Sequence, residues 1–113
     1  IEIPSDDVRM GACYVSDIVD GLIRHMHSPK DVTVANLGSD QLVLLSIMAE
    51  TIIRLTESSS QIRFVPTAKP PQEPPLPDLT RARHALSWLP LVRMEDGLRR
   101  MIEYAQSRRQ LMG

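Results

Sequence analysis

The sequence predicts a small α/β fold with about four helices and two to four short strands. Apolar residues recur at helical spacing in separate stretches of the 113-residue chain, and short runs rich in β-branched residues lie between them. Proline and serine clusters mark the boundaries of these stretches, as turn-forming residues do. A chain of this length has room for one domain with a modest core. We therefore expect a single segment over residues 1–113.

The first residues predict short strands joined by a turn. Ile1–Ile3 alternates like the end of a strand, and Ala12–Val15 has the composition of a second one. Turn-forming residues at positions 4–7 separate the two. Two or three strands of this length make a poor independent sheet, so we expect an exposed strand edge that pairs with another domain or with another copy of the chain.

Two amphipathic helices are predicted in the first half of the chain, with a strand after each. Ser16 is placed to cap the first helix, because its hydroxyl can accept a hydrogen bond from a free N–H group, and Ser28-Pro29 ends that helix. The strands are expected at Val32–Leu37 and Ile62–Val65. The first helix has its apolar residues at Ile18, Val19, Leu22, Ile23 and Met26, and the second at Leu45, Met48, Ala49, Ile52 and Leu55.

A proline-rich loop and two further helices are predicted in the second half. Five prolines fall between Pro70 and Pro77, which requires an extended or looped chain. Asp78 is placed to cap a short third helix, and Pro90 separates this helix from the last one. The last helix is expected to bury a stripe formed by Met94, Leu98, Met101, Ile102 and Ala105.

Composition excludes several classes of partner. The formal net charge is −1, so nothing global indicates binding to nucleic acid or to an anionic membrane. No apolar run is long enough to span a membrane. The single cysteine, Cys13, excludes an internal disulfide and fits a reducing compartment, so we expect a cytoplasmic protein.

The reactive side chains do not form a catalytic or metal-binding pattern. His25 and His27 are two residues apart, and positions at that spacing do not share a face of a helix. Cys13 has no basic neighbour in sequence, so an inert thiol is expected instead of a nucleophile. Asp17 is interpreted as a first-turn carboxylate favoured by the helix dipole and not as a catalytic acid. We therefore predict no catalytic residue and no metal ligand in this chain.

Several short motifs follow one another in a fixed order along the chain. They are Tyr14-Val15-Ser16-Asp17, Asn36-Leu37-Gly38, Pro77-Asp78, Ser87-Trp88 and Glu95-Asp96-Gly97-Leu98. In this order they resemble the C-terminal third of extended short-chain dehydrogenases/reductases that act on nucleotide sugars, and UDP-glucuronate decarboxylases most of all. The resemblance runs from about Val8 to Gln106. It implies a small C-terminal substrate-binding subdomain of a Rossmann-type enzyme.

The resemblance also implies an N-terminal Rossmann domain that is absent from this sequence. In the family that domain holds NAD with a glycine-rich loop and reacts through a Tyr-x-x-x-Lys pair. Tyr14 and Tyr104 are the tyrosines here, and Ile18 and Arg108 stand four residues after them. This chain is therefore expected to hold no cofactor and to be inactive alone. NAD and a UDP- or dTDP-sugar would bind a parent epimerase, dehydratase or decarboxylase.

Substrate-binding residues follow from the same resemblance. Family members have an arginine at the positions of Met10 and Pro75, and both arginines help to hold the diphosphate of the substrate. Arg9 is one residue away and replaces the first arginine if the strand carries a bulge, and Tyr14 is expected to face the substrate pocket. Arg9 and Tyr14 are thus the predicted substrate-binding residues. The cations nearest in sequence to the second position are Lys69, Arg81 and Arg83.

The lost arginines leave a second class of function open, a degenerate module that binds no substrate and serves interaction or self-association. A homo-oligomer is expected whether the chain is a substrate-binding segment or an interaction module, because its strand edge is exposed. Pro70–Pro74 is compatible with an extended left-handed helix that a proline-binding module would recognise, whereas the resemblance favours a loop across the substrate mouth. Three helix caps are also lost relative to the family, at Leu44, Ser87 and Arg93.

Overall fold

The computed structural model describes residues 1–4, 8–28, 33–66 and 73–112, and within them it confirms the predicted α/β class. The helices are α1 (Val15–Met26), α2 (Leu45–Thr56), α3 (Thr80–Leu86) and α4 (Met94–Met112). The strands are β1 (Glu2–Ile3), β2 (Arg9–Met10), β3 (Val43–Leu44) and β4 (Arg63–Phe64). β1 pairs in parallel with β4, and β2 pairs antiparallel with β3. The strands predicted at Ile1–Ile3 and Ile62–Val65 are confirmed as β1 and β4.

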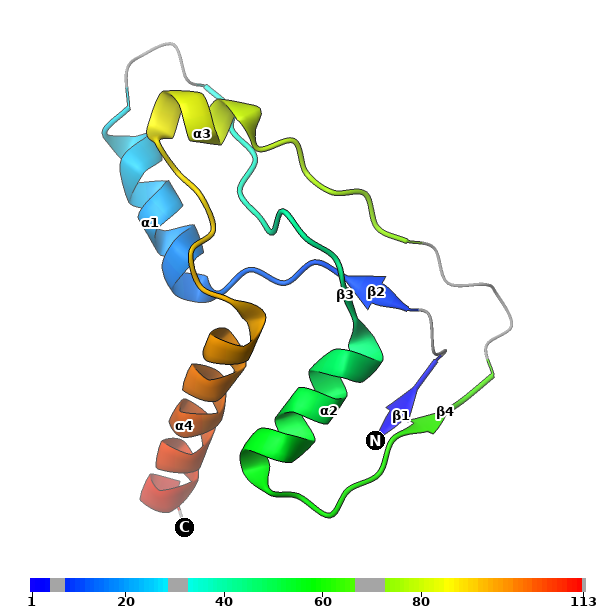
Figure 1. Cartoon of the computed structure of the whole chain (residues 1–113). Coiled ribbons are helices and arrows are strands. Elements are labelled where there is room, and N and C mark those ends of the chain that lie inside the picture. Colours follow the sequence, from blue (N-terminus) through cyan, green and yellow to red (C-terminus); the bar gives the residue numbers. More distant parts are fainter. Residues whose placement is uncertain (5–7, 29–32, 67–72, 113) are drawn as a thin grey trace.

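The elements form a thin, open arrangement (Figure 1). α1 lies beside α3, and α4 lies beside α2, with β1 and β4 on the other side of α2. The molecule measures 51 by 41 by 19 Å, and its radius of gyration is 17.1 Å. A compact domain of this length has a radius of gyration of about 13 Å. The chain is therefore too flat to enclose a large core.

The buried core is small and lies where α3 meets α1. Its members are Leu79, Ala82, Leu86 and Trp88, with Cys13, Ala35 and Leu37 half-buried against them. Trp88 donates from Nε1 to the backbone carbonyl of Asp17 at 2.7 Å, which ties the core to the first turn of α1. Gly21 lets α1 lie close to the side chain of Leu37, because a Cβ at this position would be only 2.6 Å from Cδ1 of Leu37.

Asp17 fastens the start of α1 to the segment that leads into α4. The residue is buried, and its Oδ2 accepts the backbone N–H groups of Leu91 at 3.0 Å and Val92 at 2.9 Å. The sequence predicted only that this carboxylate lies in the first turn of the helix, where the helix dipole favours it. Its two backbone partners make it a link between distant parts of the chain.

The strand predicted at Val32–Leu37 is wrong over the described residues 33–37, which have no regular secondary structure. Residue 32 lies outside the described part. A strand needs a neighbour, and neither pair of described strands includes this segment. Side chains hold it instead. The Arg81 guanidinium donates to the Val34 carbonyl at 2.8 Å. The Asn36 side chain donates to the Asp78 carbonyl at 3.2 Å.

The start of the first helix also differs from the prediction. Ala12–Val15 is not a strand, because residues 12–14 are irregular and α1 has already begun at residue 15. Ser16 is not the cap and lies inside the first turn. The N-cap is Tyr14, whose backbone carbonyl accepts the N–H of Asp17 at 3.0 Å and whose side chain makes no capping bond. The helix therefore starts two residues before the position that Ser16 would set.

The apolar stripes of the helices differ in burial. The predicted stripe of α2 is confirmed, since all its members are buried or half-buried. The stripes of α1 and α4 are only partly buried, because no described element covers their outer faces. Their exposed members are Val19, Leu22, Ile23 and Met26 in α1, and Met101 and Ala105 in α4.

Side chains close both ends of α3. The N-cap of α3 is Leu79 and not Asp78, but Asp78 Oδ1 accepts the N–H of Thr80 at 2.9 Å from one residue earlier. Hydrogen bonds from the Thr80 side chain and backbone hold the pKa of Asp78 below its ordinary value. At the other end, Ser87 has φ 52°, in the left-handed region that favours glycine. The Arg24 guanidinium of α1 donates to the carbonyl groups of Leu86 at 3.1 Å and Ser87 at 2.9 Å.

Ser87→Gly is expected to raise the free energy of unfolding by about 0.5 to 1 kcal/mol, because glycine adopts a left-handed backbone without a Cβ penalty. Urea denaturation of the chain measures the change. The matched control is Ser107→Gly inside α4, which is expected to lower the same free energy by a similar amount, since glycine is unfavourable within a helix. If both variants changed the free energy of unfolding in the same direction, the left-handed backbone of Ser87 would not explain the effect of Ser87→Gly.

Candidate functional site

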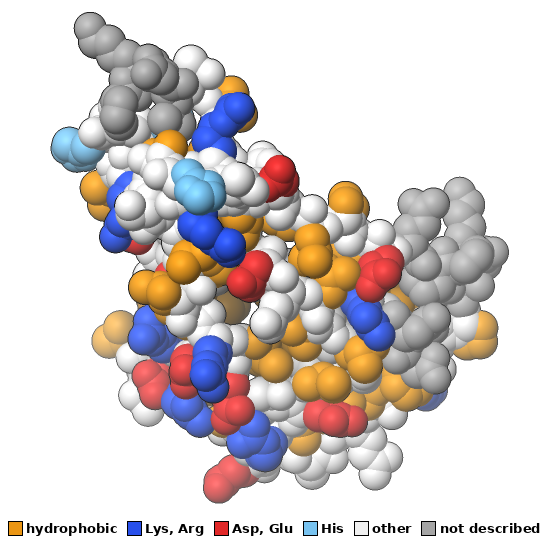
Figure 2. Space-filling view, turned by 45° about the horizontal axis from the view of Figure 1, so that its top comes forward, with side chains coloured by type: hydrophobic (Ala, Val, Ile, Leu, Met, Phe, Trp, Pro, Cys, Tyr) orange, Lys and Arg blue, Asp and Glu red, His pale blue; other side chains and the backbone are white. Residues whose placement is uncertain are grey.

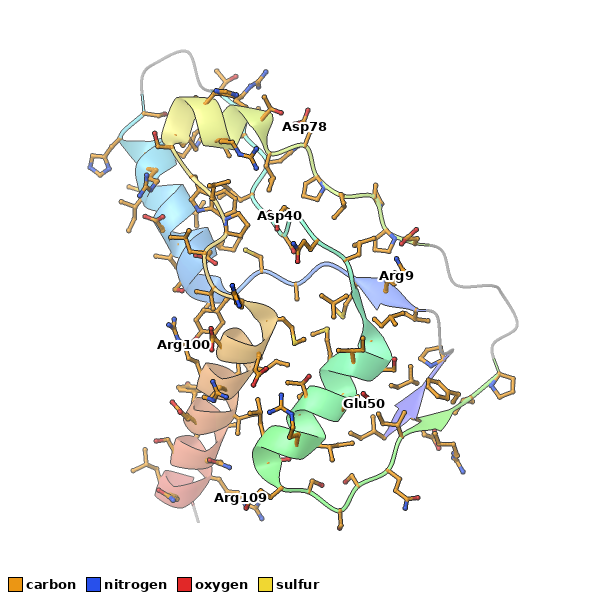
Figure 3. All side chains as sticks on the ribbon, in the orientation of Figure 1. Arg9, Asp40, Glu50, Asp78, Arg100 and Arg109 are labelled. Carbon is orange, nitrogen blue, oxygen red and sulfur yellow. The ribbon has the colours of Figure 1, made fainter. Side chains whose placement is uncertain are left out.

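Arg9 lies on β2 and faces the proline-rich segment (Figure 3). Its Nη1 atom lies 3.6 Å from Oε1 of Glu73, and both side chains are more than half exposed. β2 and β3 pair in simple register, Arg9 opposite Leu44 and Met10 opposite Val43, so these residues form no bulge. Successive side chains of a strand point to opposite faces. Arg9 therefore lies on the face opposite to that of Met10, so the expected replacement of the family's first arginine through a bulge is wrong.

A surface hollow of about 650 Å³ lies between β2 and the proline-rich segment. It is lined by Arg9, Gln41, Leu42, Glu73, Pro74, Pro75 and Leu76. Pro75 stands where the family has its second arginine, so the hollow brings Arg9 together with that position. Proline has no N–H group, so Pro74 and Pro75 offer no backbone donor to an anion. Glu73 was missed by sequence reasoning, because nothing local marks it as a partner of Arg9.

Tyr14 packs against α4 at the start of α1. A Cβ on Gly97 would lie 3.2 Å from Cδ2 of Tyr14. The guanidinium carbon of Arg100 lies 5.5 Å from the centre of the Tyr14 ring, within the range of a cation–π contact (Figure 3). Tyr14 also lines a smaller hollow of about 210 Å³ with Met48 and Met101. Arg9 and Tyr14 thus lie at different hollows, and their role in substrate binding stays a prediction.

Arg81 and Arg83, the described cations near the second arginine position, do not line the Arg9 hollow. Arg81 is bound to a backbone carbonyl and lines a separate hollow of about 510 Å³, with Asp78 and His84. Arg83 is exposed on α3. Lys69 lies outside the described residues.

Cys13, His25 and His27 belong to no candidate metal-binding group within the part of the chain that the structure describes. Burial raises the pKa of the Cys13 thiol, and the charge of nearby Asp17 raises it further, so the thiol stays protonated at neutral pH. His27 Nδ1 lies 2.9 Å from the carbonyl of Ile23. In the described ranges no group of three or more His, Cys, Asp or Glu residues is placed to hold a metal ion. No helix among the same residues has the length and apolar character needed to cross a membrane.

Charged side chains of both signs cover α4 (Figure 2). Arg99 pairs with Glu95 at 3.2 Å and with Asp96 at 3.3 Å. Arg54 of α2 lies 3.1 Å from the same Glu95 and links the two helices. These pairs give α4 a mixed, solvated face and not a basic patch for phosphate.

The fold is similar to parts of larger solved enzymes. UDP-glucose 4-epimerase of Thermotoga maritima, solved with UDP-glucose, superposes with a TM-score of 0.82 at 22% identity, over 95% of this chain and 35% of that one. WbmF of Bordetella bronchiseptica, solved with NADH, superposes with a TM-score of 0.83 at 20% identity, over 96% of this chain and 32% of that one. The predicted fold class, a subdomain of an extended short-chain dehydrogenase/reductase, is confirmed.

The sequence is similar to UDP-glucuronic acid decarboxylases. It is 37% identical over 91 residues to UDP-glucuronic acid decarboxylase 1 of Danio rerio and 36% identical over 91 residues to UDP-glucuronic acid decarboxylase 5 of Arabidopsis thaliana. Each match covers 80% of this chain, and the chain spans only 22% and 26% of those two proteins. No protein-family profile matches the chain. The resemblance found in the motifs is confirmed.

Proposed function

We propose that the chain is the nucleotide-sugar-binding C-terminal segment of an NAD-dependent epimerase, dehydratase or decarboxylase, most similar to UDP-glucuronate decarboxylases. One combined observation supports this best: 80% of the chain matches UDP-glucuronic acid decarboxylases, and 95% of it superposes on 35% of a UDP-glucose 4-epimerase. The substrate of the intact enzyme would be a UDP- or dTDP-sugar. Residues 1–113 alone would be inactive.

NAD is assigned to another part of such an enzyme. The sequence has no G-x-x-G-x-x-G loop, and neither Tyr14 nor Tyr104 is followed four residues later by lysine. Hydride transfer needs a cofactor that the fold positions against the substrate. The residues present do not fit that role. We therefore place NAD and the catalytic step in a Rossmann domain outside residues 1–113.

The exposed apolar face of α1 is the surface that we assign to that domain. This α1 seam is formed by Val15, Val19, Leu22 and Met26, which are 62, 47, 54 and 79% exposed. Its members are spaced by four, three and four residues, the spacing with which one helix packs against a neighbour. The other side of α1 buries Asp17 and Gly21 against the rest of this chain. The α1 seam is therefore exposed and can pack against another domain.

The flat shape of the chain supports the same assignment. Its shortest dimension is 19 Å, and its radius of gyration of 17.1 Å exceeds the value of about 13 Å for a compact domain of this length. A chain this thin leaves apolar side chains on its surface that another domain can cover.

Arg9 is the residue that we propose for the diphosphate, because it lines the same hollow as Pro75, the position of the family's second arginine. Its guanidinium is always charged, and its donors match two phosphate oxygens at once. The hollow beside it measures about 650 Å³, within the size range of ligand sites. Tyr14 is proposed for substrate contact from the start of α1, where Gly97 and Arg100 fix its ring.

Calorimetric titration of UDP-glucuronate into the intact polypeptide that carries residues 1–113, with NAD present, tests the proposed function. Saturable binding is the expected result. A folded polypeptide that shows no binding at millimolar UDP-glucuronate would refute it.

The second candidate is a non-catalytic interaction module. Met10 and Pro75 favour it, because each replaces an arginine that binds the diphosphate in the family. The α1 seam would then serve a protein partner and not a catalytic domain of the same enzyme. Absence of nucleotide-sugar binding in the intact polypeptide would favour this candidate.

The isolated chain is expected to self-associate through its uncovered α1 seam, because exposed apolar surface of this kind drives association. Leu22→Glu puts a charge in the α1 seam and is expected to shift sedimentation toward the monomer. The matched control is Leu111→Glu, at an exposed leucine near the end of α4, which is expected to leave self-association unchanged. A wild-type chain that sediments as a monomer at every concentration would rule this prediction out.

A further inference from the structure

The Arg9 hollow contains one positive and one negative side chain. Arg9 Nη1 and Glu73 Oε1 lie 3.6 Å apart. The other described residues that line the hollow are uncharged: Gln41, Leu42, Pro74, Pro75 and Leu76. The charges of Arg9 and Glu73 therefore cancel within the described lining.

Among the described residues of the hollow, Arg9 is the one with a charged donor for an anion. Pro74 and Pro75 lack N–H groups, so the segment opposite Arg9 offers few backbone donors. Gln41 can supply a neutral amide, and hydrogen bonds from neutral groups to an anion are weaker than those from a guanidinium. A bound diphosphate would thus need the same guanidinium that Glu73 contacts, and the Glu73 carboxylate would repel it.

We propose that Glu73 is an internal competitor at this site, where its carboxylate holds the Arg9 guanidinium until a nucleoside diphosphate displaces it. The inference rests on the proposed function, because it takes Arg9 as the diphosphate-binding residue. Both side chains are more than half exposed, and exposed ion pairs are weak and readily exchanged. Glu73 therefore lowers the affinity of the site for diphosphates without closing it.

Calorimetric titration of UDP into the intact polypeptide that carries residues 1–113 tests the role of Glu73. Glu73→Gln keeps the size of the side chain and removes its charge, and it is expected to bind UDP about two- to fivefold more tightly, the range that an exposed ion pair spans. The matched control is Glu50→Gln, at an exposed glutamate of α2 that does not line the hollow (Figure 3). It makes the same change in net charge and is expected to leave the affinity unchanged.

Arg9→Ala separates the competitor role from the proposed function. Arg9→Ala combined with Glu73→Gln is expected to lose the gain in affinity. A chain in which Arg9→Ala weakens UDP binding and Glu73→Gln leaves it unchanged would overturn the competitor role and keep Arg9 as the diphosphate-binding residue. Equal gains in Glu73→Gln and Glu50→Gln would overturn it as well. Absence of UDP binding in every variant would overturn both the competitor role and the proposed function of Arg9.

Discussion

Asp17→Ala is expected to lower the free energy of unfolding by about 3 kcal/mol or more. The carboxylate is buried and accepts two backbone N–H groups, from Leu91 and Val92. Hydrogen bonds to a charged group contribute about 1.5 to 3 kcal/mol each, and alanine leaves both donors without this partner. Urea denaturation followed by tryptophan fluorescence measures the change, because the single tryptophan, Trp88, is buried and donates to the Asp17 carbonyl.

Two further variants show whether the position or only the charge of this carboxylate matters. Asp17→Asn keeps an oxygen at the same place, so it is expected to be less destabilising than Asp17→Ala. Asp96→Ala removes an exposed first-turn carboxylate from α4 and is expected to lower the free energy of unfolding by less than about 1 kcal/mol. Equal losses in Asp17→Ala and Asp96→Ala would mean that the two backbone bonds of Asp17 contribute nothing.

Pro75→Arg is expected to raise the affinity of the chain for UDP at least about tenfold. The substitution restores the second of the two arginines that hold the diphosphate in the family, and a single charge-assisted hydrogen bond of about 1.5 kcal/mol is enough for a tenfold gain. Pro75 lines the hollow that also contains Arg9, so its replacement adds a second cation beside the first. Isothermal titration calorimetry with UDP measures the gain.

The matched control adds the same charge elsewhere. Leu111→Arg places an arginine at an exposed position of α4, away from the Arg9 hollow. This variant is expected to leave the affinity for UDP almost unchanged. If Pro75→Arg and Leu111→Arg raised it equally, the gain would come from general attraction and the Arg9 hollow would not be the diphosphate site.

The helices could be predicted from the sequence because apolar spacing and capping residues are local features. Asp78 is one example, since its carboxylate accepts the N–H of Thr80 at the start of α3, although the N-cap is Leu79. The strand predicted at Val32–Leu37 is wrong over residues 33–37, because composition alone does not decide whether a strand forms. Its residues have the right composition, but a strand also needs a neighbouring strand, and no described one lies beside residues 33–37. Ser16 has a suitable side chain for a cap, but the carbonyl of Tyr14 fixes an earlier start.

The candidate site could be predicted only in part. Arg9 and Tyr14 were named through the resemblance to a family, since no local pattern marks either residue. Glu73 could not be found, because the path of a proline-rich segment past β2 is a tertiary feature. The partners of Asp17 were missed for the same reason. Its side chain accepts hydrogen bonds from Leu91 and Val92, which lie more than 70 positions later in the sequence. Long-range polar contacts of this kind produce no periodic pattern of residues in a sequence.

Hydrogen–deuterium exchange of the intact polypeptide that carries residues 1–113, with NAD present, tests most directly whether this chain lines the substrate site. Exchange is compared without UDP-glucuronate and at saturation. We expect slower exchange in peptides that cover residues 8–14 and 73–79, and no change in peptides from the end of α4. Saturation with UDP-glucuronate and unchanged exchange in both segments would show that the nucleotide sugar binds elsewhere and would contradict the proposed function of this chain.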